Sequence, residues 1–223
     1  MTPFPGGVGI SGLSVYDWET VDGVCGGSPH VHLVCSEAYV VVAGEGRVQT
    51  LTGSGPGETP LAEGTVAWFT PGTVHRLIND DGRLRIVVIM QNDGLPEAGD
   101  AVFTFPPKVL ADPDAYAEAA VADSEPAAKA RRDLAIEGFL DLRRRGPEGL
   151  AEFHRAAVRL KAGLLPGWRR RWQDGPLAAA HRTAAQLESL NRGEADYLMH
   201  SELRTRPPQP KLGMCGRLDT YRP

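Results

Sequence analysis

Hydrophobic and polar positions in the first half of the chain form short segments that predict β-strands. These segments are rich in β-branched and aromatic residues, and Gly, Pro, Asn or Asp residues separate them. In chain order they are 15–21, 37–42, 47–51, 65–69, 74–78 and 84–91. The turns at 44–46 and 80–82 have hairpin chemistry, and residues 52–60 have the composition of a turn-rich surface connection. Short strands at this spacing predict an antiparallel sandwich or barrel.

From about Asp112 the apolar residues change to the three-to-four-residue period of helices. Asp112 followed by Pro113 is typical of a helix start, because Asp caps the first turn and Pro fits its first position. The clearest period runs through Leu150, Phe153 and Ala157. The later helices are expected over 129–145, 150–164, 176–191 and 194–203.

These two patterns divide the chain into a β part, residues 1–111, and an α-helical extension with a tail, residues 112–223. We expect residues 1–14 to form an arm laid on the barrel or on a neighbouring subunit, and residues 204–223 to be extended. The first part carries five Lys/Arg and twelve Asp/Glu, so the rest carries a net positive charge. Opposite charges favour docking of the helical part on the barrel or on a partner subunit.

Composition narrows the function classes. The chain is 42% apolar with a net charge of -4, which favours a soluble protein and argues against nucleic acid as a partner. No apolar run approaches the length of a membrane span, and the start lacks the features of a signal peptide, so a cytoplasmic location and no membrane partner are expected. The three cysteines do not suggest a disulfide framework.

Three histidines and one glutamate have the spacing of a metal site. Side chains alternate along a strand, so His30 and His32 project to the same side. Glu37 lies five residues after His32 and can join them only if a turn or bulge falls within residues 33–36. His75 would complete the set. Imidazole nitrogens with one carboxylate suit one divalent transition ion (Fe, Mn, Ni, Cu, Co or Zn) and leave positions open for substrate.

At these residues the sequence resembles the cupin superfamily. His30-x-His32-x4-Glu37-x6-Gly44 resembles the first cupin motif, and Gly64-x7-Gly72-x2-His75-x3-Asn79 resembles the second. Val24 and Thr70 stand where the motifs usually have Gly and Pro. The resemblance covers residues 15–105 and implies a cupin-type antiparallel β-barrel, or jelly roll, with metal held by the four residues. It does not select a reaction, because cupins include dioxygenases, decarboxylases, isomerases, epimerases, sugar-binding and storage proteins.

Other candidates each have a structural alternative. Tyr39 shares a strand face with Glu37 and either contacts a substrate or fills the barrel. Gln91 could bind a carboxylate or carbonyl if its strand face points inward, although the other face of that strand is more apolar. Trp68 is expected in the core. The histidines of the helical part, His154, His181 and His200, are expected at the surface, with one near the barrel mouth only if the helices form a lid.

Two functions remain open. The first is a metal-dependent enzyme, of dioxygenase or isomerase type, acting on a small oxygen-rich metabolite such as a hydroxy-acid, keto-acid or enediol. The second is a non-catalytic metal- or sugar-binding or sensor module. Titratable groups near the open metal positions would favour the enzyme. A small-molecule substrate is the expected partner, and the N-terminal arm suits a homodimer.

Overall fold

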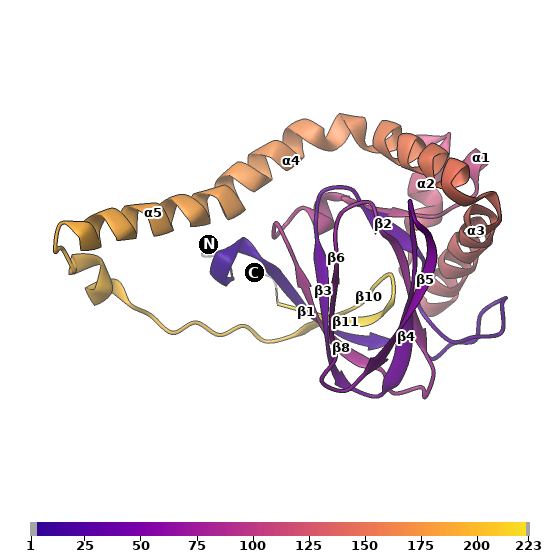
Figure 1. The fold of residues 1–223 in the computed structure, drawn as a ribbon, viewed down its shortest axis with the longest axis horizontal. Helices are drawn as coiled ribbons and strands as arrows, with labels where there is room; N and C mark the ends of the chain where they lie inside the picture. The colour runs from indigo at the N-terminus through magenta and orange to yellow at the C-terminus, as the bar shows by residue number, and fades with distance from the viewer. Residues whose placement is uncertain (1–3, 222–223) are drawn as a thin grey trace.

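Two antiparallel sheets face each other in the computed structural model, which describes residues 4–221 (Figure 1). One sheet has six strands in the order β10-β11-β1-β8-β3-β6, and the other has five in the order β5-β4-β7-β2-β9. The predicted fold class, a mainly β jelly-roll barrel followed by helices, is confirmed. The strands are β1 (Gly9–Val15), β2 (His30–His32), β3 (Glu37–Ala43), β4 (Glu45–Thr52), β5 (Gly55–Ala62), β6 (Val66–Phe69), β7 (Val74–Asn79), β8 (Arg85–Met90), β9 (Ala101–Phe103), β10 (Gln209–Leu212) and β11 (Gly216–Thr220).

The two turns expected to close hairpins instead carry the chain from one sheet to the other. β3 belongs to the six-stranded sheet and β4 to the five-stranded sheet, and β7 and β8 are divided in the same way. Gly44 has φ 78°, and a Cβ placed on it would lie 2.4 Å from the carbonyl carbon of Arg83. The two turns therefore pack directly on each other, and glycine provides both the backbone conformation and the space.

Residues 52–60, expected as a surface connection, are largely an edge strand. β5 pairs with β4 and lies at the end of its sheet. Pro56 and Pro60 fit there because an edge strand has backbone positions that need no ladder hydrogen bond. The prolines made this segment look like a loop in the sequence.

The early strand lies before its predicted position. β1 occupies residues 9–14 of the predicted N-terminal arm and runs between β11 and β8, whereas residues 16–21 leave the sheet. Tyr16 stacks on Trp18 with ring centroids 3.9 Å apart, and the carbonyls of Trp18 and Glu19 accept hydrogen bonds from Arg132. Those carbonyls thus bond to a helix side chain in place of a neighbouring strand. Residues 1–3 of the predicted N-terminal arm lie outside the described residues.

The helices α1 (Pro107–Leu110), α2 (Pro113–Ala120) and α3 (Glu125–Lys161) lie beside the five-stranded sheet (Figure 1). Asp112 caps α2 as predicted, accepting from the backbone amides of Asp114 and Ala115. α3 replaces two expected helices and breaks at Gly146, where φ is 63° and ψ is -151°. The predicted apolar face is buried at Leu150, Phe153 and Ala157, and it joins the core that includes Phe103 and Phe105.

Beyond α3 the chain forms a projecting arm, defined here as residues 165–203. It contains α4 (Leu165–Trp172), a π-helical turn (Gln173–Leu177), α5 (Ala178–Asn191) and a 3-10 turn (Asp196–His200) in place of the last expected helix. Figure 1 shows it extending away from the barrel. Smaller 3-10 turns are η1 (Pro5–Gly7), η2 (Pro96–Ala98) and η3 (Ala162–Leu164). No described helix has both the length and the apolar character needed to cross a bilayer.

After the arm the tail returns to the barrel. β10 and β11 extend the six-stranded sheet beyond β1, and the turn between them, residues 213–215, lies at the barrel mouth. The extended tail expected from the sequence is therefore partly sheet. Trp68, expected in the core, is 74% exposed, because its position on β6 alternates with the inward-facing Ala67 and Phe69.

Candidate metal centre

The four predicted ligand residues come from three strands in two different sheets. His30 and His32 lie on β2, and His75 lies on β7 directly opposite His30. Glu37 is the first residue of β3 in the facing sheet. The turn expected within residues 33–36 is observed, and it carries the chain across from one sheet to the other. Three imidazoles on one sheet therefore face one carboxylate on the other.

The ligand atoms of these residues converge between the sheets. One atom from each of the four lies within 4.8 Å of the others. His75 Nε2 is 3.1 Å from both His30 Nε2 and Glu37 Oε2, and His32 Nε2 is 3.3 Å from Glu37 Oε2. All four side chains are buried, with His75 fully inaccessible to solvent. The spacing read from the sequence thus corresponds to one cluster.

Each imidazole is oriented by an acceptor on its other nitrogen. His30 Nδ1 lies 3.0 Å from the carbonyl of Ser28, and His75 Nδ1 lies 3.1 Å from the carbonyl of Thr73. His32 Nδ1 lies 3.0 Å from Asp100 Oδ2. Carbonyls and carboxylates only accept, so Nδ1 carries the hydrogen in each of these pairs. For the neutral rings this leaves the Nε2 lone pairs directed at the centre of the cluster.

Asp100 is a residue that the sequence did not single out. It is fully buried, and its carboxylate accepts hydrogen bonds from the backbone amides of Val34 (2.7 Å) and Leu33 (3.1 Å) as well as from His32. It therefore fixes both the imidazole of His32 and the turn that leads to Glu37. Asp100 lies 68 residues after His32 in the sequence, so no local motif could predict this contact.

Burial and close contacts shift the pKa values of the cluster in different directions. Burial, followed by the neighbouring His75 and His32, lowers the pKa of His30 well below its ordinary value. Burial also opposes ionisation of His32 and Glu37, but their contacts with oppositely charged groups outweigh the effect of burial on both pKa values. Close contacts with the carboxylates of Asp100 and Glu37 raise the pKa of His32 to about 9, and close contacts with the imidazoles of His32 and His75 lower the pKa of Glu37. Glu37 is therefore an ionised carboxylate.

The donor set fits a divalent transition ion. Glu37 Oε2 is buried and has no hydrogen-bond partner among residues 4–221, although it lies beside two imidazole nitrogens. A buried anionic oxygen without a hydrogen bond is unfavourable unless a cation compensates it. Three nitrogens and one oxygen are the donors that such ions accept, so the cluster could hold a metal.

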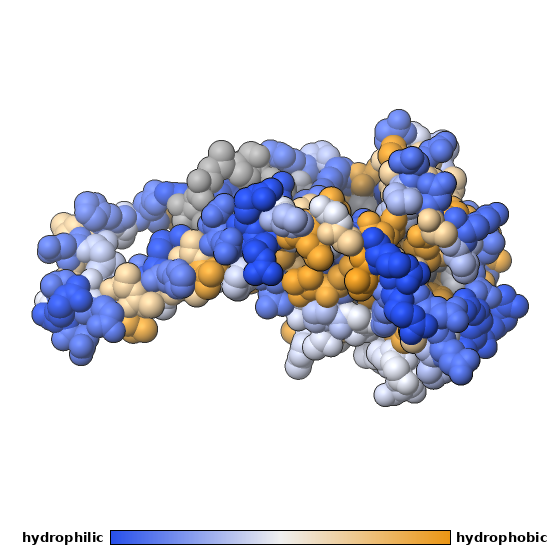
Figure 2. All heavy atoms as spheres, turned by 90° about the horizontal axis from the view of Figure 1, so that it is seen from above, coloured by the Kyte–Doolittle hydropathy of each residue, from blue (hydrophilic) through white to orange (hydrophobic). Residues whose placement is uncertain are grey.

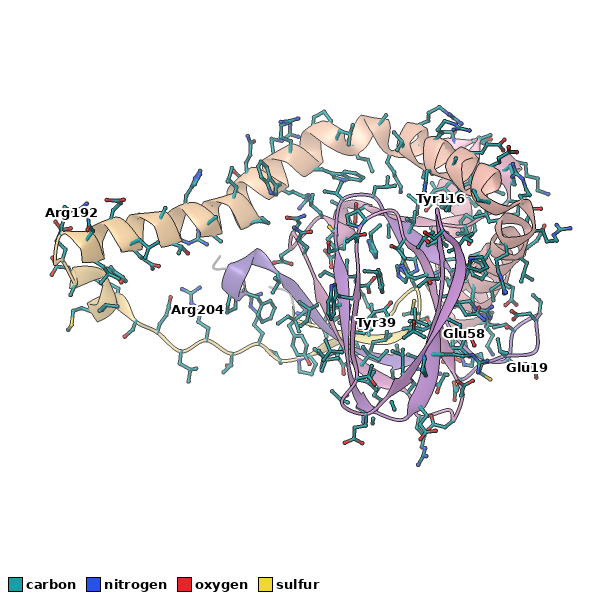
Figure 3. The ribbon with its side chains drawn as sticks, viewed as in Figure 1. Glu19, Tyr39, Glu58, Tyr116, Arg192 and Arg204 are labelled. Carbon is teal, nitrogen blue, oxygen red and sulfur yellow. The ribbon has the colours of Figure 1, made fainter. Side chains whose placement is uncertain are left out.

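A cavity of about 300 Å³ opens onto the cluster. His30, His32 and Glu37 line its inner part, and Tyr39 lies beside them inside the barrel (Figure 3). The Tyr39 hydroxyl is buried, and no residue in the described part of the chain forms a hydrogen bond with it. Burial, with the nearby Glu37 carboxylate, raises the pKa of Tyr39 well above its ordinary value. Tyr39 is therefore a neutral O–H donor close to the predicted ligands.

Gln91 is not brought to this cavity. It follows the last residue of β8, is exposed, and accepts a hydrogen bond from the backbone amide of Ser36 at 3.2 Å. Ile86 and Val88 fill the interior from the alternate positions, so the strand face of Gln91 points outward. The inward placement considered for Gln91 is thus corrected, and its contact instead ties down the turn before Glu37.

The histidines of the helical part do not join the cluster. His154, on α3, donates from Nε2 to the carbonyl of Gly72 at 3.0 Å. It therefore contacts the turn that precedes His75 without reaching the ligands. His181 and His200 are exposed on the arm, as expected.

Arg131 and the tail form the outer wall of the cavity, and sequence reasoning missed both. Arg131 comes from α3, is 8% exposed and donates to the carbonyls of Gly213 (2.6 Å) and Ala120 (3.3 Å). Its Nε is buried without a partner, and among residues 4–221 no carboxylate forms an ion pair with it. Lys211, Met214 and Cys215 of the tail line the same cavity. A buried cation thus faces the space beside the metal cluster.

Comparisons with known proteins identify a family for part of the chain. The family model described as "Cupin domain" matches residues 18–90. No curated protein matches the sequence. The chain spans only part of the solved structures that it resembles, from 67% of one of them down to 18% of another.

Three such structures illustrate the likeness. An uncharacterized conserved protein with a double-stranded β-helix domain from Klebsiella pneumoniae is 20% identical, with 39% of this chain and 67% of that chain covered and a TM-score of 0.30. The capsular polysaccharide assembling protein CapF from Staphylococcus aureus is 19% identical, with 46% and 29% covered and a TM-score of 0.36. The TDP-fucose-3,4-ketoisomerase WlaRA from Campylobacter jejuni is 10% identical, with 43% and 64% covered and a TM-score of 0.33.

Proposed function

The chain belongs to the cupin superfamily through its residues 18–90, and from this premise we propose that it is a metal-dependent enzyme acting on a small oxygen-rich acid. The observation that carries the proposal is the position of the cluster. Four buried donor atoms lie within 4.8 Å of one another, and three of their residues, His30, His32 and Glu37, line a cavity that Tyr39 and Arg131 also line. The reaction would be of the dioxygenase or isomerase type.

The side chains would have three roles: metal ligands, a hydrogen-bond donor to the substrate and, as argued below, a cation that binds an acid. His30, His32, His75 and Glu37 would hold one divalent ion and leave about two positions of an octahedral shell open toward the cavity. When bound, such an ion polarises a substrate oxygen or, if it is redox-active, supports oxygen chemistry. Tyr39 would donate its O–H to a substrate oxygen, and its raised pKa keeps that proton in place at neutral pH.

Arg131 supports an acid as the substrate. Burying a guanidinium without a carboxylate is unfavourable, and a carboxylate entering the cavity would supply the missing partner. Lys211 and Glu97 also line the cavity, and their opposite charges offset each other, so Arg131 is the group that favours an acid. A cavity of about 300 Å³ suits a small metabolite, because it lies at the lower end of ligand-site volumes. Hydroxy-acids and keto-acids, which can bind a metal through two oxygens, fit these requirements.

Metal content is the first test. Purified protein should carry about one transition ion per chain, and His32→Ala or His75→Ala should remove most of it, because each deletes a converging donor. His181→Ala, which changes an exposed histidine on the arm, is the matched control and should retain the ion. Wild-type protein that retains no metal after loading with each candidate ion would exclude the proposal.

Turnover is the second test. Metal-loaded protein would be screened against small hydroxy-acids and keto-acids, with oxygen uptake reporting a dioxygenase and deuterium exchange from solvent reporting an isomerase. Activity that tracks metal content across the variants supports the enzyme. Tight binding of an acid with neither signal would instead identify the non-catalytic binding or sensor module.

A further inference from the structure

A groove of about 710 Å³ lies where the arm meets the barrel. Its barrel side includes Leu95 and Val34, which belongs to the turn before Glu37, and its arm side consists of residues of α4. Figure 2 shows apolar surface gathered where the arm leaves the rest of the molecule. The groove has no lining residue in common with the metal cavity. It is therefore a separate compartment without a part in the proposed function.

The floor of the groove is held by buried contacts. Trp168 is 5% exposed, packs in one buried cluster with Leu95, and donates from Nε1 to the carbonyl of Ala98 at 2.9 Å. The backbone amide of Val34 donates to Asp100 Oδ1 at 2.7 Å. Both sides of the groove are thus fixed to the barrel before anything binds. A ligand that enters such a site does not have to order its floor, which favours affinity.

The walls of the groove are apolar and open to solvent. Leu165, Val34 and Trp172 line it and are 50%, 41% and 39% exposed. Within residues 4–221 no aromatic ring or cation packs on the Trp172 indole. A free indole face offers a flat apolar surface on which another ring can stack. The groove therefore suits an apolar, and above all an aromatic, group.

The charge of the groove is positive. Arg169 and Arg170 line it, and no acidic residue of the described chain does. Among residues 4–221 neither guanidinium forms an ion pair. The arm as a whole holds five Arg and five Asp/Glu, so this excess of positive charge is local to the groove. Solvated arginines are ordinary on a protein surface, but here two of them border an apolar wall. A guanidinium binds carboxylates and phosphates through paired hydrogen bonds.

We propose that this groove binds a small amphipathic anion. Its apolar or aromatic body would lie against Trp172 and Leu165, and its carboxylate or phosphate would pair with the guanidinium of Arg169 or Arg170. The dimensions favour a small molecule over a protein. The volume is within the range of ligand sites, about 300 to 1,000 Å³. Nine residues line the groove, whereas a stable protein contact uses roughly 20 to 30 on each side.

Titration calorimetry of the full chain with naphthoate, an aromatic carboxylate, tests the groove. Naphthoate should bind to about one site per chain and about 10-fold more tightly than naphthalenemethanol, because only the carboxylate can pair with a guanidinium. The two compounds share the same ring system. A difference in their affinities therefore reports the charge, and the affinity of the alcohol reports the apolar wall.

The double change Arg169→Gln with Arg170→Gln should remove this preference for the acid. Affinity for naphthoate should fall about 10-fold, to that of the alcohol, while affinity for the alcohol stays the same. Arg171→Gln with Arg182→Gln is the matched control. It removes the same charge from the same arm at two exposed residues that do not line the groove, so the preference should be retained.

Trp172→Ala should weaken both compounds by about 10-fold, because it removes the surface on which their rings stack. Trp68→Ala is the matched control, since Trp68 is also an exposed tryptophan but lies on β6, away from the groove. The changed residues are exposed, and circular dichroism of each variant against wild type establishes that binding is measured on folded chains.

Arg131→Met separates the groove from the metal cavity, because naphthoate is itself an acid. This change should leave naphthoate affinity unaltered, since Arg131 does not line the groove. Naphthoate binding that is lost in Arg131→Met but kept in the groove variants would place the acid in the metal cavity and overturn the proposal. Binding of oxalate at the metal cavity can succeed or fail without any effect on this result.

Three further results would also overturn the proposal. The first is no detectable binding at millimolar naphthoate, and the second is equal affinity of wild type for the acid and the alcohol. The third is a naphthoate Kd that rises with protein concentration, which would show that a second copy of the chain covers the groove. Light scattering at the same protein concentrations identifies that case.

Discussion

Asp100 holds His32 from the side opposite the metal cluster, with Asp100 Oδ2 accepting from His32 Nδ1 at 3.0 Å. The same carboxylate accepts from backbone amides of the turn between His32 and Glu37. One buried group therefore positions two of the four proposed ligands, although it lies outside residues 18–90. A carboxylate behind an imidazole raises its basicity and fixes its orientation, and both strengthen metal binding.

Removing the charge of Asp100 should weaken the metal site. Asp100→Asn keeps the shape of the side chain, but the neutral amide is a weaker acceptor for His32 Nδ1 and for the turn amides. We expect metal affinity to fall about 10- to 100-fold, measured by competition with a chelator. Glu63→Gln, an exposed acid on the barrel, is the control and should leave affinity unchanged. Unaltered affinity in Asp100→Asn would show that His32 is held by packing alone.

Arg131 should determine the preference for acids. In metal-loaded protein, Arg131→Met should weaken binding of oxalate about 10-fold or more, since a charge-assisted hydrogen bond is lost, while affinity for a neutral diol stays the same. Titration calorimetry normalised to metal content measures both. Arg132→Met is a matched control, because the neighbouring guanidinium bonds to the carbonyls of Trp18 and Glu19 and does not line the cavity. If Arg131→Met weakens binding of the acid and of the diol equally, the role of Arg131 is only to hold the tail through its hydrogen bond to Gly213.

Gly138 should be essential for docking α3 on the barrel. A Cβ placed there would lie 1.8 Å from the carbonyl oxygen of Thr104, and the Thr104 hydroxyl bonds to the Ala135 carbonyl of the same helix at 2.7 Å. Gly138→Ala forces the helix away and should lower the free energy of unfolding by about 2 kcal/mol. Gly163→Ala meets no atom within 4 Å and should be nearly neutral in the same urea titration. Similar results for the two variants would contradict the close approach.

Asp22 should make stability depend on pH through Arg76. Arg76 is fully buried and bonds to both Asp22 oxygens, at 2.6 and 3.0 Å. Burial opposes the charge of Asp22, but hydrogen bonds from Arg76 and Thr20 lower its pKa below the ordinary 3.8. A lowered folded-state pKa means that the stabilisation is complete above the unfolded value and disappears as the pH falls through the folded value.

Asp22→Asn should therefore lower the stability at neutral pH by about 2 kcal/mol, because Arg76 loses its charged partner, and the difference from wild type should shrink in acid. Urea unfolding at several pH values measures it. Glu58→Gln, which breaks the exposed ion pair to Arg47, should cause a much smaller change. A difference that persists unchanged below the unfolded pKa would show that charge is not its origin.

The sequence alone was sufficient to predict the local features of the fold and of the site. Strand composition placed most of the barrel strands, Asp112 capped a helix as expected, and Leu150, Phe153 and Ala157 are buried at helical spacing. The spacing of His30, His32, Glu37 and His75 in the sequence predicted the cluster, because the ligands lie at or next to strands of fixed period. These features depend on neighbours within a few positions along the chain.

Only the tertiary structure decided which strands pair and what surrounds the cluster. The Gly44 and Gly82 turns looked like hairpins but join the two sheets, because β3 pairs with β8 and β4 pairs with β7. Asp100, Arg131 and Cys215 reach the site from positions 63 to 178 residues after Glu37, and no local pattern encodes such contacts. Sequence alone thus determined the proposed ligands, through short-range periodicity and side-chain chemistry. Their orientation, their buried electrostatics and the wall of the cavity depend on long-range packing, which is the physical reason that they became visible only in the folded chain.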